Sequence, residues 1–230
     1  MAVLVSVKLV KIKFFEGGFR VWASVSKVAD ALYLSGCLKF GSFRIKSGAL
    51  SPYYIDLAGL LSSPRALCGV AEVAACEIRN LMAIERIDKL ASIELKGALI
   101  LPSIACQLDL PCIVVRKEEK VYGVTGRIAG AEVVKGDCVL FFDDVVSEGL
   151  SKVEGIKPLE ELGAKVKNIM VVVDREQGGR ESLERLGYRV HALAKISEIV
   201  DSLLQLKRIS KEQAQAVISY VEEFKTRQSR

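Results

Sequence analysis

Short, nearly continuous apolar runs are the feature that most constrains the fold of this chain. Three of them are PCIVV (111–115), DCVLFF (137–142) and KNIMVVV (167–173). Strands that are apolar on both sides are typical of parallel sheets whose two faces are covered by helices. Stretches with helical character, such as 99–109 and 157–164, separate these runs. The alternation predicts an α/β fold with an open, mostly parallel sheet and flanking helices.

The rest of the chain adds elements on both sides of these runs. A length of 230 residues, 50% of them hydrophobic, suits one sizeable domain. We expect that domain to span 25–230, with helices at its C-terminus, and residues 1–24 to form an N-terminal extension whose order the sequence leaves undecided. Further expected elements are a strand in 3–15 that is broken by Gly17 and Gly18, a helix from Val25 to Ser35, a hairpin or extended arm in 40–57, a helix from Pro64 to Met82, strands in 87–93 and 188–194, and two helices in 196–224, the last starting with a Ser210–Gln213 capping box.

Charge and histidine content exclude several classes of protein. The net charge of +5, from 33 basic and 28 acidic residues, suits a polyanionic small molecule and is too small to indicate nucleic acid. His191 is the only histidine, so a histidine-rich zinc site is excluded, and a Ser–His or Cys–His nucleophile would have to use this residue. Its alternating apolar surroundings favour a packed structural histidine.

Cysteine usage and hydropathy point to an ordinary intracellular protein. The six cysteines contain no C-x-x-C pair, which argues against a zinc or thioredoxin-type site, and most lie in apolar stretches, so we expect small, buried side chains. The sequence shows no convincing secretory signal and no apolar run of about 18 residues. The cytoplasm is therefore the expected location, with neither membrane nor nucleic acid as a partner.

Residues 139–151, VLFFDDVVSEGLS, carry the strongest chemical signal. An apolar strand ends at Asp143 and Asp144, and a Ser/Gly loop follows. Open α/β sheets bind ligands at the carboxyl ends of their strands, where a loop can offer backbone N–H groups and hydroxyls to a phosphate. Paired carboxylates at this place suit ribose hydroxyls, a metal ion or positive charge that develops on a sugar ring. The alternative is a strand end with two solvated acids.

This motif resembles the phosphoribosyl-pyrophosphate motif of type I phosphoribosyltransferases. Residues 39–67, 111–130 and 171–193 narrow the resemblance to orotate phosphoribosyltransferase, including the form fused in UMP synthase. The resemblance implies the fold of that family with an N-terminal hood, and the transfer of phosphoribosyl from phosphoribosyl pyrophosphate to orotate, which yields orotidine 5′-phosphate and pyrophosphate for UMP biosynthesis. It also implies Mg2+ as cofactor, a homodimer that shares a lid loop, and an orotidine 5′-phosphate decarboxylase partner.

The resemblance also assigns roles to residues. Asp143 and Asp144 would face the ribose, and Lys120 would be the catalytic lysine of the lid. The substrate-binding residues would be Ser147, Gly149 and Ser151 around the 5′-phosphate, Lys96, Arg116, Lys117 and Tyr122 in the pyrophosphate loop and the lid, and Lys46, Tyr53, Tyr54 and Arg175 on the orotate side. Without the family, the lid segment RKEEK is a solvated charge patch, and both tyrosines are packing residues. Lys46 is equally well explained as a solvated turn lysine, and Arg175 could equally pair with Asp174 or Glu176. No residue is assigned to a metal.

Both anion-binding loops depart from the family pattern. Glu148 and Leu150 stand in the phosphate loop, where small or hydroxyl residues are usual, and Glu94 stands in the pyrophosphate loop. A carboxylate close to a phosphate repels it by about 4 kcal/mol per charge pair at an effective dielectric constant of about 20. Phosphate binding would therefore require that Glu148 points outward or that Lys152 compensates its charge.

The helix after the phosphate loop is a third departure. Gly155 and Pro158 interrupt KVEGIKPLEEL, where an unbroken helix is expected, so a fresh start at Pro158 is one interpretation. The phosphate would then lose part of a helix N-terminus. Together the departures leave a second hypothesis open, a catalytically impaired relative that binds orotate or a nucleotide as a sensor or partner subunit. A transferase for another base is disfavoured by the SPYYIDL and DREQGG blocks.

Overall fold

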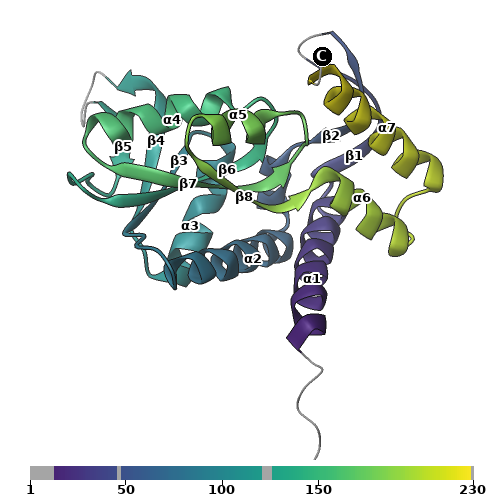
Figure 1. The fold of residues 1–230 in the computed structure, drawn as a ribbon, viewed down its shortest axis with the longest axis horizontal. Coiled ribbons are helices and arrows are strands. Elements are labelled where there is room, and N and C mark those ends of the chain that lie inside the picture. The colour runs from purple at the N-terminus through teal and green to yellow at the C-terminus, as the bar shows by residue number, and fades with distance from the viewer. Residues whose placement is uncertain (1–12, 46–47, 121–125, 229–230) are drawn as a thin grey trace, which may run out of the picture.

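The computed structural model describes residues 13–45, 48–120 and 126–228. Within them lie a six-stranded sheet and a two-stranded sheet (Figure 1). The large sheet consists of β3 (Lys89–Ile93), β4 (Cys112–Lys120), β5 (Gly126–Gly130), β6 (Cys138–Val146), β7 (Lys165–Asp174) and β8 (Arg189–Lys195). Its strand order is β5-β4-β3-β6-β7-β8, and neighbouring strands are parallel except β4 and β5. The expected open, mostly parallel sheet is confirmed.

Helices cover both faces of the large sheet (Figure 1). On one face lie α2 (Pro64–Met82) and α3 (Lys96–Leu108), and on the other lie α4 (Leu150–Glu161) and α5 (Gly179–Arg185). Alternate residues of a strand point to opposite faces. Leu140 and Phe142 of β6 therefore join the core under α2 and α3, whereas Phe141 joins the core under α4 and α5. Burial on both faces explains why the central strands are apolar throughout.

The remaining elements form a unit that we call the hood. It consists of α1 (Lys13–Leu34), the antiparallel hairpin of β1 (Leu38–Arg44) and β2 (Leu50–Ile55), α6 (Ile196–Gln205) and α7 (Lys211–Gln228). These segments from the two ends of the sequence lie side by side, with α1 against α6 and α7 against β2 (Figure 1). A short 3-10 helix, η1 (Leu57–Ser62), leads from the hairpin into α2. The expected hairpin and the two C-terminal helices are confirmed.

Two helix starts follow the expected signals, and one does not. Pro64 begins α2, and Ser210 and Gln213 form the reciprocal capping bonds at the start of α7, with N–H···O distances of 3.2 and 2.9 Å. The strand expected in 3–15 and its break at Gly17 are wrong where the structure describes them, because α1 begins at Lys13 and continues through both glycines. Tertiary packing of a helix can override the modest helix penalty of glycine.

The cysteines are less buried than we expected. Cys37 is buried, but Cys68, Cys76 and Cys106 are exposed. The three exposed cysteines lie on the outer faces of α2 and α3. The opposite face of α2 is turned to the core, and there Val70 and Ala74 are buried. An apolar stretch gives the composition of a helix, but the position on the helix decides which face a side chain occupies.

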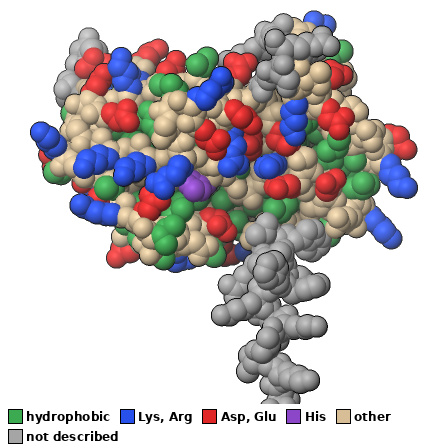
Figure 2. Space-filling view, in the orientation of Figure 1, with side chains coloured by type: hydrophobic (Ala, Val, Ile, Leu, Met, Phe, Trp, Pro, Cys, Tyr) green, Lys and Arg blue, Asp and Glu red, His purple; other side chains and the backbone are tan. Residues whose placement is uncertain are grey.

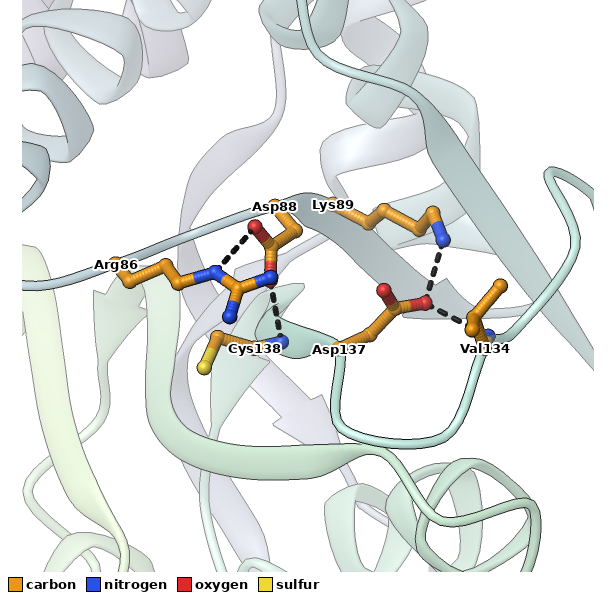
Figure 3. Close-up of polar contacts among 6 residues, drawn as sticks. All are labelled: Arg86, Asp88, Lys89, Val134, Asp137 and Cys138. Atoms are coloured by element: carbon orange, nitrogen blue, oxygen red, sulfur yellow. Dashed lines mark hydrogen bonds and ion pairs between the residues drawn. The ribbon is translucent and has the colours of Figure 1, made fainter.

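The amino ends of β3 and β6 are closed by a compact group of polar contacts (Figure 3). Lys89 pairs with Asp137 at 2.5 Å, and Asp137 also accepts the N–H of Val134 at 2.8 Å. Asp88 accepts the N–H of Cys138 and pairs with Arg86, each at 2.8 Å. The Cys138 N–H and then the Arg86 guanidinium hold the pKa of Asp88 below its usual value. Each of these two aspartates accepts a backbone N–H and pairs with a basic side chain, which indicates a structural role.

His191 has a structural environment, in keeping with the sequence. It is half-buried in β8, and its Nε2 lies 3.1 Å from the amide oxygen of Asn168. Burial, and after it the charges of Arg189 and Arg180, lower the pKa of His191 below its ordinary value. On the face shown in Figure 2, basic side chains are interspersed with acidic ones around this histidine. Within the part of the chain that the structure describes, no helix is long and apolar enough to cross a bilayer.

Candidate active site

The carboxyl ends of the parallel strands meet the hood at one edge of the sheet. The loops after β3, β6 and β7 begin at Glu94, Ser147 and Arg175 and lie at this edge. The Nε of Arg175 donates to the hydroxyl of Tyr53 in β2 at 3.2 Å, and the guanidinium carbon lies 5.1 Å from the Tyr53 ring centroid. The hood therefore contacts the edge where open α/β sheets bind their ligands.

The two aspartates at the end of β6 are both buried, so neither is a solvated acid. Asp143 is 5% exposed and Asp144 is 8% exposed. Burial and then the negative charge of Asp143 raise the pKa of Asp144 to about 6, against the partial compensation by Lys152 and Lys96. Asp144 forms no ion pair with any residue that the structure describes. A buried carboxylate without a direct cation partner is suited to meet a polar or cationic ligand.

The phosphate loop after β6 is seated on the start of α5. Gly149 has a φ of 88°, and a Cβ at this position would lie 3.0 Å from the carbonyl oxygen of Gly179. A Cβ on Gly179 would lie 2.4 Å from the carbonyl oxygen of Ser147. Two glycines are thus required for the loops after β6 and β7 to touch. This contact explains the glycine pair of DREQGG as a packing requirement as well as a turn, since Gly178 has a φ of 86°.

The departures in this loop interfere less with anion binding than the sequence suggested. The side chain of Glu148 is exposed, where solvent and salt screen its charge. The start of a new helix at Pro158 is wrong, because α4 is continuous from Leu150 to Glu161. Gly155 is required within it, since a Cβ there would lie 2.6 Å from Cζ of Phe141 and 2.9 Å from Cβ of Ile93. The positive end of the α4 dipole is therefore preserved beside Ser147 and Gly149.

Lys152 is a member of the site that sequence reasoning did not assign. Its Nζ lies 2.6 Å from Oδ2 of Asp143, and both side chains are almost completely buried. It does not compensate Glu148, which has no ion pair among the described residues. A lysine two residues into the helix after an acidic strand end was the available signal. The tertiary contact could not be read from it.

On the pyrophosphate side, Lys96 and Glu94 both have partners. The Nζ of Lys96 lies 3.1 Å from Oδ1 of Asp56. Burial by itself would lower the pKa of Lys96, but the bond to Asp56 raises it above the ordinary value, so Lys96 remains charged. Glu94, the second acid that departs from the family pattern, accepts the backbone N–H of Lys117 at 2.5 Å and so connects β3 to β4. The Glu94–Leu95 peptide bond is cis.

Three of the expected lid residues, Arg116, Lys117 and Lys120, belong to β4. Arg116 donates to the carbonyl oxygens of Gly126 at 3.0 Å and Ile128 at 3.5 Å, which ties β4 to β5. The Lys117 side chain is exposed. Lys120 ends β4, but its side chain, like the whole of Tyr122, lies outside the described residues.

Arg175, which we expected on the orotate side, contacts the hood through Tyr53 and has no acidic partner among the described residues. No carboxylate of the described residues lies within ion-pair distance of Arg175, although Asp174 and Glu176 are its neighbours. Glu176 instead pairs with Lys225 of α7 at 2.9 Å. Tyr53 is 1% exposed, and burial raises its pKa against the opposing effect of Arg175.

The other two residues expected on this side are less informative. Tyr54 is 44% exposed and packs on Phe43 with ring centroids 5.7 Å apart. Lys46 lies outside the described residues. The structure thus brings together Arg175 and Tyr53, and it places Tyr54 on the outer side of the hairpin.

Comparison with known proteins identifies the family. No family model matches the sequence. An orotate phosphoribosyltransferase of Pyrococcus abyssi is 40% identical over 168 residues, which are 73% of this chain and 91% of that protein. The chain belongs to the orotate phosphoribosyltransferase family. A solved orotate phosphoribosyltransferase of Aeropyrum pernix has a similar fold, with a TM-score of 0.67, 28% identity, and coverage of 80% of this chain and 99% of that one.

A UMP synthase has a similar fold as well. The structure of Leishmania donovani UMP synthase matches with a TM-score of 0.79 and 31% identity over 90% of this chain. This chain spans 44% of the length of that UMP synthase. Family membership confirms the expected type I phosphoribosyltransferase fold and an enzyme class, the pentosyltransferases of pyrimidine biosynthesis.

Proposed function

We propose that this chain transfers the phosphoribosyl group of phosphoribosyl pyrophosphate to orotate. The observation that carries the proposal is the direct backbone connection between Arg175 and the end of β6, where the loop 147–151 begins. The backbone N–H of Arg175 donates to the carbonyl oxygen of Val146 at 3.0 Å, so the end of β7 is fixed one residue before Ser147. A single edge of the sheet therefore offers a phosphate cradle, the buried Asp144 and an arginine without a carboxylate partner.

Each part of the two substrates has a complementary group at this edge. The 5′-phosphate would bind the backbone N–H groups and hydroxyls of Ser147, Gly149 and Ser151 at the N-terminus of α4. The ribose hydroxyls would bind Asp144. The guanidinium of Arg175 suits the carboxylate of orotate, because its planar fork can form two parallel hydrogen bonds. Tyr53 fixes the orientation of that guanidinium.

The reaction replaces one bond at C1′ of the ribose by another. The bond from C1′ to the pyrophosphate oxygen breaks, its electron pair leaves with pyrophosphate, and a ring nitrogen of orotate forms the new bond to C1′. Positive charge develops on the ribose while negative charge grows on the leaving group. The carboxylate of Asp144 stabilises the first, and Lys96 with the lid cations Arg116, Lys117 and Lys120 stabilises the second. The attacking ring nitrogen also loses its proton, which passes to water or to an oxygen of the leaving pyrophosphate, so no side chain is needed to accept it.

The metal proposal is limited by the ligands that the protein offers. Among the residues that the structure describes, no group of three or more potential ligands could hold a metal ion by itself. Asp143 is already paired with Lys152, which leaves Asp144 as the carboxylate open to a cation. Mg2+ binds phosphate oxygens and keeps several waters. We therefore propose Mg2+ as a cofactor that pyrophosphate and Asp144 would hold and that would offset the charge of the leaving group.

The expected partners are proposals too. We propose a homodimer in which the lid with Lys120 and Tyr122 reaches the site of the other subunit, and an orotidine 5′-phosphate decarboxylase as a protein partner, since relatives include fusions named UMP synthase. Mixing Lys120→Ala and Asp144→Asn subunits tests the shared lid. In an equimolar mixture about half of the dimers are heterodimers, each with one complete site of two, so the mixture should recover about a quarter of the wild-type rate. No recovery, with subunit exchange verified by mass spectrometry, would exclude it.

A spectrophotometric assay tests the transfer itself. The loss of orotate absorbance is followed with phosphoribosyl pyrophosphate and Mg2+, and pyrophosphate is measured as the second product. The expected result is equimolar consumption of orotate and release of pyrophosphate, lost in Asp144→Asn. Lys120→Ala should lower kcat about a hundredfold or more, whereas Lys135→Ala, at an exposed lysine that precedes the amino end of β6, should not. Orotate binding without turnover in the wild-type protein would instead support a sensor.

The structure offers little support for that sensor reading. Its support was Glu148, Leu150 and Glu94, together with the interrupted helix after the loop. Glu148 and Leu150 are exposed, Glu94 is engaged with the backbone of β4, and α4 is continuous. None of these departures places a buried, unpaired negative charge in the phosphate loop.

A further inference from the structure

Lys152 has an unusual position for a lysine, inside the protein at the base of the phosphate loop. It is the third residue of α4, and its side chain is 6% exposed. Three acceptors surround its Nζ: Oδ2 of Asp143 at 2.6 Å, the carbonyl oxygen of Val145 at 2.5 Å and Oγ of Ser151 at 3.4 Å. A lysine ammonium has three N–H donors. Each donor therefore has a protein acceptor, and none is left for a phosphate.

These three acceptors lie on both sides of the phosphate loop. Asp143 and Val145 belong to the end of β6, and Ser151 belongs to the first turn of α4. Lys152 thus joins the two ends of the segment 146–150 through one ammonium group. Because a loop held at both ends loses less conformational entropy on binding, this arrangement prepares the cradle for its ligand.

The same contact fixes Asp143 away from the substrate. Its Oδ1 accepts the N–H of Asp144 at 2.9 Å. On that side the carboxylate is enclosed, since a Cβ on Gly97 would lie 2.5 Å from Oδ1 of Asp143 and 2.5 Å from Oγ of Ser92. Its Oδ2 is taken by Lys152. Both oxygens of Asp143 are therefore occupied within the protein.

The charge of Lys152 is needed where it lies. Two ionised carboxylates on adjacent buried residues repel each other, and removal of one partner of a buried ion pair leaves an uncompensated charge. Lys96, the other nearby cation, is paired with Asp56. Among the described residues, Lys152 is the cation in direct contact with the acidic pair.

We propose that Lys152 is a positioning residue of the transfer site, a built-in counter-ion that holds Asp143 away from the ligand and fixes the phosphate loop. The effect of Lys152 on catalysis rests on the transferase function proposed above. It assigns the direct contact with the ribose to Asp144 alone. It also predicts that the ammonium occupies the place on Asp143 that a divalent cation would otherwise take.

Metal binding without substrate tests the charge part of the proposal. Mn2+ is titrated into the metal-free protein and followed by electron paramagnetic resonance. Wild-type protein should bind no Mn2+ at the acidic pair, whereas Lys152→Met should gain one site, and the double variant Lys152→Met with Asp143→Asn should lose it again. The inference is overturned by a wild-type Mn2+ site that Asp143→Asn abolishes, or by a folded Lys152→Met protein that gains none. A purely structural lysine would not change Mn2+ stoichiometry.

Steady-state kinetics test the loop part. Lys152→Met should raise KM for phosphoribosyl pyrophosphate about tenfold and leave KM for orotate within about twofold. The reason is that the substitution releases only the phosphate loop, which Lys152 holds at both ends. Equal changes in both constants would contradict this. Should Lys152→Met fail to fold, Lys152→Gln replaces it in both experiments, since the amide still donates to Val145. The Mn2+ titration requires no turnover, so an inactive enzyme would refute the proposed function without deciding the role of Lys152.

Discussion

Replacing Gly155 by alanine should destabilise the protein, although the same change normally strengthens a helix. In an exposed helix, Gly→Ala gains roughly 1 kcal/mol. At Gly155 the added Cβ would lie 2.6 Å from Cζ of Phe141 and 2.9 Å from Cβ of Ile93, both fully or almost fully buried. Overpacking of such a site costs about 1–3 kcal/mol, and the upper part of this range, about 2–3 kcal/mol, applies here because both contacts would be shorter than 3.0 Å. We expect a net loss of about 1–2 kcal/mol in the free energy of unfolding.

Gly69 provides a matched control in the helix on the opposite face. It lies within α2, and a Cβ there would meet only Cε of Lys27, at 3.5 Å, an ordinary contact with a flexible chain end. Gly69→Ala should therefore raise the free energy of unfolding by about 0.5–1 kcal/mol. The two variants have the same chemistry, so opposite signs isolate the contact of α4 with the sheet.

Denaturant titration and thermal unfolding measure both effects. For a chain of this size 1 kcal/mol corresponds to about 2–4 °C in Tm, so Gly155→Ala should melt lower by roughly 2–8 °C. Displacement of α4 should also raise KM for phosphoribosyl pyrophosphate, because the helix begins at the phosphate loop. The reasoning is refuted if Gly155→Ala is as stable as the wild-type protein, or if Gly69→Ala loses as much stability.

Three further predictions concern the site. Burial and Asp143 raise the pKa of Asp144 from 3.8 to about 6, so the stability linked to its proton is complete below pH 3.8 and is lost as the pH rises through 6. The free energy of unfolding of Asp144→Asn should therefore increase relative to that of the wild type by on the order of 3 kcal/mol between about pH 4 and pH 7. Urea titrations that give the same difference at every pH would contradict this. Arg175→Lys should raise KM for orotate about tenfold or more, because an ammonium cannot form the paired bonds of a guanidinium; calorimetric orotate affinity equal to wild type would count against the assignment. Glu148→Thr should lower KM for phosphoribosyl pyrophosphate only about two- to fivefold at low salt, since an exposed charge is screened, and a hundredfold gain would mean that Glu148 reaches the phosphate.

Sequence patterns predicted those parts of the site that depend on position along a strand. Asp143 and Asp144 end an apolar run, and the carboxyl ends of parallel strands share one edge, so a ligand site at 143–151 followed from the sequence. The glycines that looked like damage or simple turns required the structure. Gly155 and Gly179 are explained by atoms of Phe141, Ile93 and Ser147, which lie near them only after folding.

Side-chain pairing was the part that the sequence could not give. Lys152 seemed a candidate partner for Glu148, its neighbour on the loop, but it pairs with Asp143. Arg175 could equally have paired with Asp174 or Glu176, yet it contacts Tyr53, which is distant in sequence. Partner choice between several nearby acids depends on a few ångströms and on burial, and neither is encoded in spacing alone.

The sequence by itself determined the class of fold and predicted the edge of the sheet where we propose the chemistry, because both follow from local periodicity and from the polarity of strand ends. The tertiary structure alone decided which aspartate is enclosed and which is open, how the hood reaches the end of β7, and where glycine is the sole residue that fits. Those features arise from contacts between segments far apart in the chain, whose distances are fixed only when the two cores and the hood pack together.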